Sequence, residues 1–491
     1  MIEINLLTPP GNREMTTDFT DQATLQDLGI EALIDAMAAG DPSIGSVALQ
    51  CFLHAPVDPS VIRWRQEVLR DSLNHPELIR DLKVIAHHGA ALERRSSYAL
   101  RPQPPISLLL RSRELLGLLI PDLRALAHRF AELDSNFTSE GLELLATAIN
   151  EHFGDDDLDK LDVAIRELRF EHGLIAWASL GAGNLTSSRL LLQGPIGSRG
   201  WRDRLHLTLG DRNRIEIAPR DQAGGDALRG LRNQALAEIG SVAARGLRTI
   251  IEFFVELNRQ LAWLVGAINL HDRLKALGLP LCFPSPTLSQ GQLAFQSLVE
   301  PTLALRTHLR PVSNDLGTST RAPIVISGAN SGGKTTWLQG VALAMLMMQA
   351  GLFVTAEAFN ADARTHLYTF FPRDEDRDLQ RGRLDDELTR LSTTISALSP
   401  EGLLFLNEPL STTNEIEACA IMSALVDNLT RRDVTTFVVT HYPTLARALA
   451  TNGTSLRPET AVDGARTYRI EPSAPPEDSS AMDVYSRLGG W

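Results

Sequence analysis

The sequence feature that most constrains the fold is the stretch 325–336, VISGANSGGKTT. Gly328, four further residues and then Gly333-Lys334-Thr335 fit the pattern G-x-x-x-x-G-K-[ST] of phosphate-binding loops. A glycine-rich turn that only shares these letters is the alternative, and the flanking sequence argues against it.

Apolar stretches flank this loop on both sides. The β-branched run 324–326 precedes it, and the apolar segment 337–349 follows it. They predict a strand, a glycine loop and a buried helix, an order that aims backbone N–H groups at a polyphosphate. In such a loop Lys334 would reach the β- and γ-phosphates, and the Thr335 hydroxyl would bind Mg²⁺.

Length and composition describe a soluble protein of several domains. A chain of 491 residues has material for about three domains. Its 43% hydrophobic and 22% charged residues are ordinary for a globular protein. The net charge of −13 argues against coating nucleic acid with the whole surface but leaves room for a local basic patch.

Several absences in the sequence favour a cytoplasmic location. The three cysteines form no C-x-x-C pair, so neither a disulfide framework nor a zinc site is indicated, which suits a reducing cytosol. The N-terminus has no signal-peptide pattern. The chain has no uncharged apolar run of about 18 residues, so we expect no membrane span.

Hydrophobic periodicity divides the chain into a helical half and an α/β half. Helical spacing begins at Leu25, and Asp58-Pro59 starts a helix in the cap-then-proline order. Long helices are predicted over 108–130, 142–171 and 228–277, the second interrupted at 154–157 and the last broken near 240–246. Short alternating runs at 190–192, 205–209 and 215–217 predict strands, as do 293–298 and 304–309. The expected segments are a lead-in over 1–24, a mostly helical region over 25–180, a small β insert over 181–226, returning helices over 227–284 and an α/β nucleotide-binding domain over 285–491.

The predicted β insert is locally basic. Its candidate DNA-contacting residues are Arg199, Arg202, Arg204, Arg212 and Arg214. A basic, turn-rich β tip on a helical arm suits contact with a phosphate backbone. An arginine-rich solvated loop is the equally weighted alternative.

The segment 403–408, LLFLNE, adds a second element of nucleotide chemistry. Four apolar residues running into Glu408 describe a buried parallel strand with a carboxylate at its C-terminal end, the edge where ligands bind open α/β sheets. Glu408 is then placed to orient or deprotonate the water that attacks a γ-phosphate. Asn407 stands where an aspartate would usually help to hold Mg²⁺. Its amide oxygen can accept from a metal-bound water but carries no charge, so weaker Mg²⁺ binding or turnover is expected.

A third element ends at His441. The β-branched run 434–440 predicts a buried strand, and His441 follows it directly. A histidine in this place is either structural or a sensor of the γ-phosphate. The phosphate-binding loop and Glu408 at matching spacing favour the sensor.

These three segments, in this order and spacing, resemble the ATPase domain of the MutS mismatch-repair family, which belongs to the ABC-type ATPases. The quoted segments are GANSGGKTT, LLFLNEPLSTTNEIEA and VVTHYPTLARAL. The segment 351–356 is similar to the family pattern G-x-x-V-P-A. In the helical half, 62–68 resembles the helix that opens the MutS core domain, and 265–277 resembles its returning lever helix.

The resemblance implies an ABC-type ATPase that acts as a homodimer with composite ATP sites and uses ATP and Mg²⁺. It implies that Glu408 is the catalytic carboxylate and His441 the switch histidine, and that 411–413 crosses the dimer interface. The β insert takes the place of the family's DNA clamp, and 25–180 that of its core and lever. The nucleotide-binding residues it implies are Gly328, Asn330, Ser331, Gly332, Gly333, Lys334, Thr335 and Thr336.

Three departures from the family pattern place the chain in a divergent branch. With about two dozen residues before the core, we expect no mismatch-reading or connector domain. The letters Phe254-Val255-Glu256 match the mismatch wedge but lie inside a helical pattern, so we expect core residues. The trans-acting signature serine is replaced by the stretch 380–387, QRGRLDDE, where Arg381 or Arg383 is a candidate substitute, and Asn407 replaces the aspartate.

Two functional hypotheses follow. The first is a dimeric MutS-like ATPase that couples nucleotide state to DNA binding through phosphates and shape, without mismatch reading. The second is a nucleotide-switched scaffold with weak or no hydrolysis that engages a protein partner. A transporter ATPase does not explain the helical arm, and a small-molecule kinase does not explain Glu408 and His441.

Overall fold

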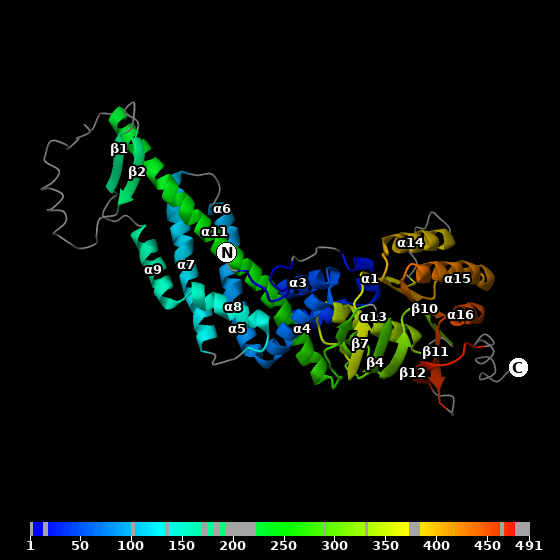
Figure 1. Cartoon of the computed structure of the whole chain (residues 1–491). Helices are drawn as coiled ribbons and strands as arrows, with labels where there is room; N and C mark the ends of the chain where they lie inside the picture. The colour runs from blue at the N-terminus through cyan, green and yellow to red at the C-terminus, as the bar shows by residue number, and fades with distance from the viewer. Residues whose placement is uncertain are drawn as a thin grey trace. The chain divides into compact units, whose positions relative to one another are not determined.

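The computed structural model describes residues 3–12, 18–99, 104–132, 137–168, 175–180, 186–192, 222–288, 291–328, 332–372, 383–411, 413–461 and 466–476. The chain divides into two compact units. The first contains 1–4, 80–136 and 143–259, and the second contains 5–79, 137–142 and 260–491. Figure 1 shows both units and labels many of their helices and strands.

The first unit is mostly helical, as predicted. Its helices are α5 (Pro76–Ala90, which begins in the second unit), α6 (Glu93–Ala99), α7 (Pro105–Ala131), α8 (Glu140–His152), α9 (Asp155–Glu167) and the greater part of α11 (Gln222–Ala276). Phe254 of α11 is fully buried, and a Cβ added at Gly89 of α5 would lie 2.4 Å from its ring. Phe254 is therefore a core residue, which confirms the prediction for the Phe-Val-Glu letters.

Helix α11 corrects one prediction. It runs unbroken for 55 residues, so the predicted break near 240–246 is wrong. A Cβ at Gly240 would lie 3.3 Å from the carbonyl oxygen of Pro105. Gly240 therefore allows close approach to α7 rather than ending the helix, a tertiary effect that outweighs the low helix propensity of glycine.

A two-stranded antiparallel sheet precedes α11 in sequence. It pairs β1 (Ile175–Leu180) with β2 (Thr186–Leu192). The predicted strand at 190–192 is confirmed as the end of β2, whereas β1 was missed. The predicted strands at 205–209 and 215–217 lie outside the described residues.

The second unit begins with the short helices α1 (Gln22–Asp27), α2 (Glu31–Ala38), α3 (Pro42–Leu53) and α4 (Pro59–Asn74). Asp41 and Asp58 cap α3 and α4, each followed by proline at the first helical position. This confirms the cap-then-proline prediction. Trp64 of α4 donates a 2.8 Å hydrogen bond to the carbonyl oxygen of Asn5, so α4 holds the N-terminal segment.

The described part of the second unit contains a six-stranded sheet in the order β12-β11-β6-β10-β9-β8. Its strands are β6 (Ile324–Ser327), β8 (Leu367–Phe370), β9 (Leu403–Asn407), β10 (Thr435–Thr440), β11 (Thr454–Thr460) and β12 (Arg466–Pro472). All neighbours are parallel except β11 and β12. Strands β6, β8, β9 and β10 are buried along their whole length. The predicted buried parallel strands before the glycine loop, Glu408 and His441 are confirmed.

Helices cover this sheet, and their apolar residues supply its core. They are α13 (Lys334–Gln349), α14 (Arg383–Ala397), α15 (Glu415–Arg431) and α16 (Pro443–Ala450). Residues of α14, α15 and α16 pack with those of β8, β9 and β10 in one cluster. Helix α13 is buried nearly all round, as the apolar segment after the glycine loop predicted.

A smaller sheet, in the order β3-β7-β4-β5, completes the unit. It consists of β3 (Ser285–Thr287), β4 (Gln292–Leu298), β5 (Asn314–Ser319) and β7 (Ala358–Asp362), and α12 (Pro301–Thr307) lies between β4 and β5 in the chain. The predicted strand at 293–298 is confirmed as β4. The predicted strand at 304–309 is wrong, because Glu300 caps α12 and Pro301 occupies its first turn.

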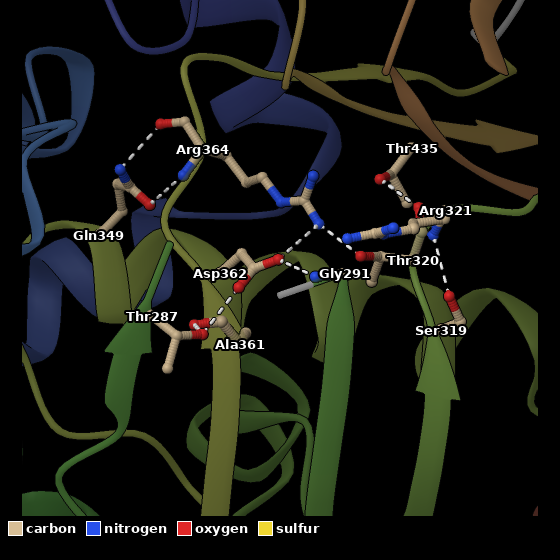
Figure 2. A network of polar contacts seen from close by, with 10 residues as sticks. All are labelled: Thr287, Gly291, Ser319, Thr320, Arg321, Gln349, Ala361, Asp362, Arg364 and Thr435. Atoms are coloured by element: carbon tan, nitrogen blue, oxygen red, sulfur yellow. Dashed lines mark hydrogen bonds and ion pairs between the residues drawn. The ribbon is translucent and has the colours of Figure 1, made fainter. Parts of the chain in front are cut away.

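A buried polar network joins the two sheets (Figure 2). The Asp362 carboxylate accepts hydrogen bonds of 2.7 Å from the Thr287 hydroxyl and from the Gly291 backbone N–H. Arg364 lies 3.9 Å from this carboxylate and donates a 2.6 Å hydrogen bond to the Thr320 hydroxyl. Thr435 at the start of β10 donates to the Thr320 carbonyl oxygen at 2.7 Å. The smaller sheet is thus fixed to the strand that ends at His441.

Among the described residues, no helix is long and apolar enough to cross a membrane.

Candidate nucleotide-binding site

The glycine loop connects β6 to α13 as its sequence predicted. Gly328 has a φ of 139° and Gly333 a φ of 87°, conformations that L side chains rarely adopt. Gly333 is the residue before the first turn of α13, so the unsatisfied N–H groups of that turn open toward the loop. Asn330 and Ser331 lie outside the described residues.

Lys334 is the first residue of α13 and is nearly buried, with 4% of its surface exposed. Its Nζ donates a 2.8 Å hydrogen bond to the carbonyl oxygen of Gly328. Burial lowers the pKa of this amine, and the nearby Glu408 carboxylate partly opposes that effect. A poorly hydrated ammonium beside a helix N-terminus favours a bound anion.

Thr335 contacts Asn407, the other residue predicted to hold the metal, which ends strand β9. Its hydroxyl donates a 3.2 Å hydrogen bond to the Asn407 amide oxygen at the end of β9. The pairing offers two neutral oxygens side by side. Such hard oxygen donors suit Mg²⁺, which usually keeps several waters beside one or two protein ligands. The donor set therefore fits Mg²⁺, which Thr335 would bind directly and Asn407 would bind through water, with no negative charge from Asn407.

Glu408 and His441 follow neighbouring strands and face each other. The register of β9 and β10 pairs Asn407 with Val439, and the Glu408 N–H donates 2.9 Å to the Val439 carbonyl oxygen. The Glu408 carboxylate lies 3.8 Å from His441 Nδ1, and both side chains are about a third exposed, at 27% and 34%. The two groups that the sequence analysis singled out separately therefore lie next to each other in the structure.

The backbone after β9 is strained. Glu408 has a φ of 48° and Leu410 a φ of 57°, although neither is glycine. Such conformations cost roughly 1–3 kcal/mol each and persist where surrounding contacts impose them. Two contacts come from the segment after β10: the Tyr442 hydroxyl donates 2.9 Å to the Thr413 carbonyl oxygen, and the Thr444 N–H donates 2.9 Å to the Glu415 carboxylate.

A cavity of about 600 Å³ adjoins the glycine loop. Its lining combines the loop residues and Glu408 with apolar side chains such as Leu309, Val312 and Trp337. The lining residues are Leu298, Glu300, Leu303, Thr307, Leu309, Arg310, Pro311, Val312, Asn314, Gly333, Lys334, Thr335, Thr336, Trp337, Gly340, Glu408 and Tyr468. The size suits a ligand such as a nucleotide.

Tyr468 of β12 is a lining residue that the sequence analysis missed. It is half exposed, has a φ of 60° and lies against Gly333, where an added Cβ would come 3.5 Å from its ring. No motif marks it, because its place depends on β12 pairing next to β11 at the sheet edge. Its ring offers a flat apolar surface at the cavity.

The remaining predicted site residues lie in the loop, at the cavity, on α14 or outside the described residues. Gly332 is buried in the loop, and Thr336 lines the cavity. Arg381 and the arginines of the β insert, Arg199, Arg202, Arg204, Arg212 and Arg214, lie outside the described residues. Arg383 is the first residue of α14.

Two family models match the chain over most of the described regions. The model described as the MutS2 N-terminal domain matches residues 57–277, and the model described as MutS domain V matches residues 324–463. The second range contains β6, β9 and β10 with Lys334, Glu408 and His441. The chain belongs to the MutS family.

Relatives in this family include proteins named "Endonuclease MutS2". The protein of Streptococcus suis is 28% identical over 246 residues, which cover 47% of the chain and 30% of the relative. That of Thermomicrobium roseum is 30% identical over 258 residues, covering 50% and 31%. That of Lactococcus lactis subsp. cremoris is 26% identical over 250 residues, covering 47% and 30%. The alignments thus span about a third of the length of these relatives.

Proposed function

We propose that this MutS-family chain binds ATP with Mg²⁺, hydrolyses it, and couples its nucleotide state to DNA binding as a homodimer. The observation that carries the ATP site is the meeting of three strand ends at one edge of the sheet, where Lys334 and Glu408 line the same cavity. Lys334 follows β6, Glu408 follows β9 and His441 follows β10, and the Glu408 carboxylate lies 3.8 Å from His441 Nδ1. Ligands of open parallel sheets bind at this edge.

Each polar residue has a distinct task in this proposal. Lys334 and the first turn of α13 receive the phosphates, which replace the Gly328 carbonyl oxygen as the partner of the Lys334 amine. Mg²⁺, when bound, neutralises charge on the phosphate oxygens. Glu408 orients or deprotonates the attacking water, and His441 senses the γ-phosphate beside it.

The apolar residues in the cavity lining suit the nucleobase. Tyr468 lies against Gly333, and Leu309 and Val312 expose 70% and 42% of their surface in the same lining. A base stacked on the Tyr468 ring would bury these surfaces.

The DNA part of the proposal rests on the MutS family and on the basic β insert. Exchanging Arg202, Arg204, Arg212 and Arg214 for glutamate should abolish DNA binding, and wild-type affinity should fall steeply with salt. DNA affinity that changes neither with salt concentration nor with the four substitutions would contradict a DNA clamp in this segment.

The whole proposal is tested by steady-state ATP hydrolysis without DNA, with duplex DNA and with branched DNA. We expect turnover that rises with DNA and is lost in Lys334→Ala. Turnover that persists in Lys334→Ala would place the activity elsewhere.

A second candidate is a nucleotide-switched scaffold that binds a protein partner. The observation that favours it is the neutral Asn407 beside Thr335, since no carboxylate there helps to hold Mg²⁺. Tight ATP binding without turnover under any DNA condition would support this candidate over the ATPase.

A further inference from the structure

The proposed catalytic carboxylate stands on a strained loop, and α14 contacts that loop directly. The Glu387 carboxylate of α14 accepts a 2.7 Å hydrogen bond from the Leu410 backbone N–H. Leu410 is fully buried and has a φ of 57°. A buried N–H on a strained residue needs a partner, and a carboxylate is a stronger acceptor than a neutral oxygen.

Helix α14 is itself fixed to the neighbouring strand. Arg390, one turn after Glu387, donates a 3.1 Å hydrogen bond to the Phe371 carbonyl oxygen at the end of β8. Its guanidinium lies 4.7 Å from the centre of the Phe370 ring. Leu391 of the same helix is buried in the core cluster. Glu387 therefore reaches the loop from a helix that the sheet holds in place.

Glu387 and Tyr442 hold the loop from different elements. The Tyr442 hydroxyl donates to the Thr413 carbonyl oxygen from the segment after β10, whereas Glu387 accepts from Leu410 nearer the carboxylate. Only Pro409 separates Leu410 from Glu408, and proline has a fixed φ. A shift of the Leu410 backbone would therefore also shift the Glu408 backbone, because Pro409 between them has little conformational freedom.

We propose that Glu387 is a positioning residue for hydrolysis, which holds Leu410 and thereby aims the Glu408 carboxylate. This inference rests on the proposed ATPase function. Glu387 does not line the cavity, so it acts on turnover through the loop and not on ATP affinity. Helix α14 begins within the stretch 380–387, which occupies the place of the trans-acting signature. Glu387 therefore connects this stretch to the loop after Glu408 in the same chain.

The first test compares the purified wild-type protein with Glu387→Ala, Glu387→Gln and Asp427→Ala. Asp427 is an exposed carboxylate of α15, so its exchange removes the same charge away from the loop. We expect kcat to fall about tenfold in Glu387→Ala, the loss of one charge-assisted hydrogen bond, with the ATP Kd unchanged. Glu387→Gln keeps an acceptor oxygen and should stay within about threefold of wild type. An unchanged kcat in Glu387→Ala, or equal losses in Kd and kcat, would overturn the inference.

The second test needs no hydrolysis. Hydrogen exchange of the peptide that contains Leu410 should be faster in Glu387→Ala and unchanged in Asp427→Ala, at equal melting temperatures of the domain. If the wild-type protein binds ATP without turnover, hydrolysis is contradicted, and this exchange still decides whether Glu387 holds the loop. Equal exchange in wild type and Glu387→Ala would contradict that role.

Discussion

The Thr335 hydroxyl donates a 3.2 Å hydrogen bond to the amide oxygen of Asn407. This contact brings the end of the glycine loop to the end of β9, where a carboxylate is usual in the family that the sequence resembles. The pair supplies the oxygens that suit Mg²⁺ but no negative charge. We therefore expect weak Mg²⁺ binding at this site, and a carboxylate at position 407 should strengthen it.

Asn407→Asp should strengthen Mg²⁺ binding. The new carboxylate would add a charge at the same place without a change of shape. We expect the Mg²⁺ concentration for half-maximal ATP hydrolysis to fall roughly tenfold, for a gain of about 1.4 kcal/mol. Asn428→Asp, which adds the same charge on α15, is the control. An unchanged Mg²⁺ dependence in Asn407→Asp would mean that this position does not face the metal.

Tyr468→Ala should raise the KM for ATP and leave kcat nearly unchanged. A ring stacked on the base contributes about 1–3 kcal/mol, so a rise of roughly tenfold is expected. Tyr468→Phe keeps the ring and should behave like wild type. A KM for ATP that is the same in Tyr468→Ala and wild type would show that the base does not stack on Tyr468.

The lowered pKa of Lys334 predicts a specific pH dependence of stability without nucleotide. Because burial lowers this pKa in the folded state below the ordinary 10.5, the unfolded chain binds more protons between the two values. The stability of the wild type relative to Lys334→Met should therefore rise with pH through that window. Thermal unfolding in alkaline buffers measures it, with the exposed Lys275→Met as control. A relative stability that falls as pH rises would contradict the burial of this amine.

Asp362→Ala should destabilise the second unit. The exchange removes hydrogen bonds from Thr287 and Gly291 and the charge beside Arg364, which leaves the buried guanidinium without its nearby Asp362 carboxylate. We expect a loss of about 3 kcal/mol of unfolding free energy, measured by urea denaturation. Asp315→Ala, an exposed carboxylate that accepts one backbone N–H, should cost well under half of this. An equal loss of unfolding free energy in the two variants would show that the network of Figure 2 stabilises the fold no more than an exposed hydrogen bond does.

The elements that carry Lys334, Glu408 and His441 could be predicted from the sequence because their determinants are local. The strand before Gly328, the helix from Lys334, and the strands ending at Asn407 and His441 are each encoded by a continuous apolar run. Parallel pairing then brings their ends to one edge without further information.

The side of the cavity proposed for the nucleobase could not be predicted in the same way. Tyr468 reaches the cavity through an antiparallel edge strand and a left-handed backbone, neither of which its neighbours in sequence specify. Glu387 appears in sequence as one of several acidic residues on α14, and only the fold brings it to Leu410.

Two elements, α12 and α11, differ from the prediction because capping and glycine signals were given the wrong weight. Helix α12 was predicted as a strand, although Glu300 followed by proline is a helix start that the sequence contains. Helix α11 was predicted to break near 240–246, but it continues through this stretch, and Gly240 packs against Pro105 of α7. The first error was avoidable from the sequence, and the second was not.

The most direct measurement is ATP binding and single-turnover hydrolysis by Glu408→Gln beside wild type and Lys334→Ala. The amide keeps the shape of the carboxylate but cannot take the proton of the attacking water, so turnover should fall at least on the order of 100-fold while ATP remains bound. Lys334→Ala should lose binding as well. Turnover by Glu408→Gln at the wild-type rate would contradict the assignment of Glu408 as the carboxylate that drives hydrolysis.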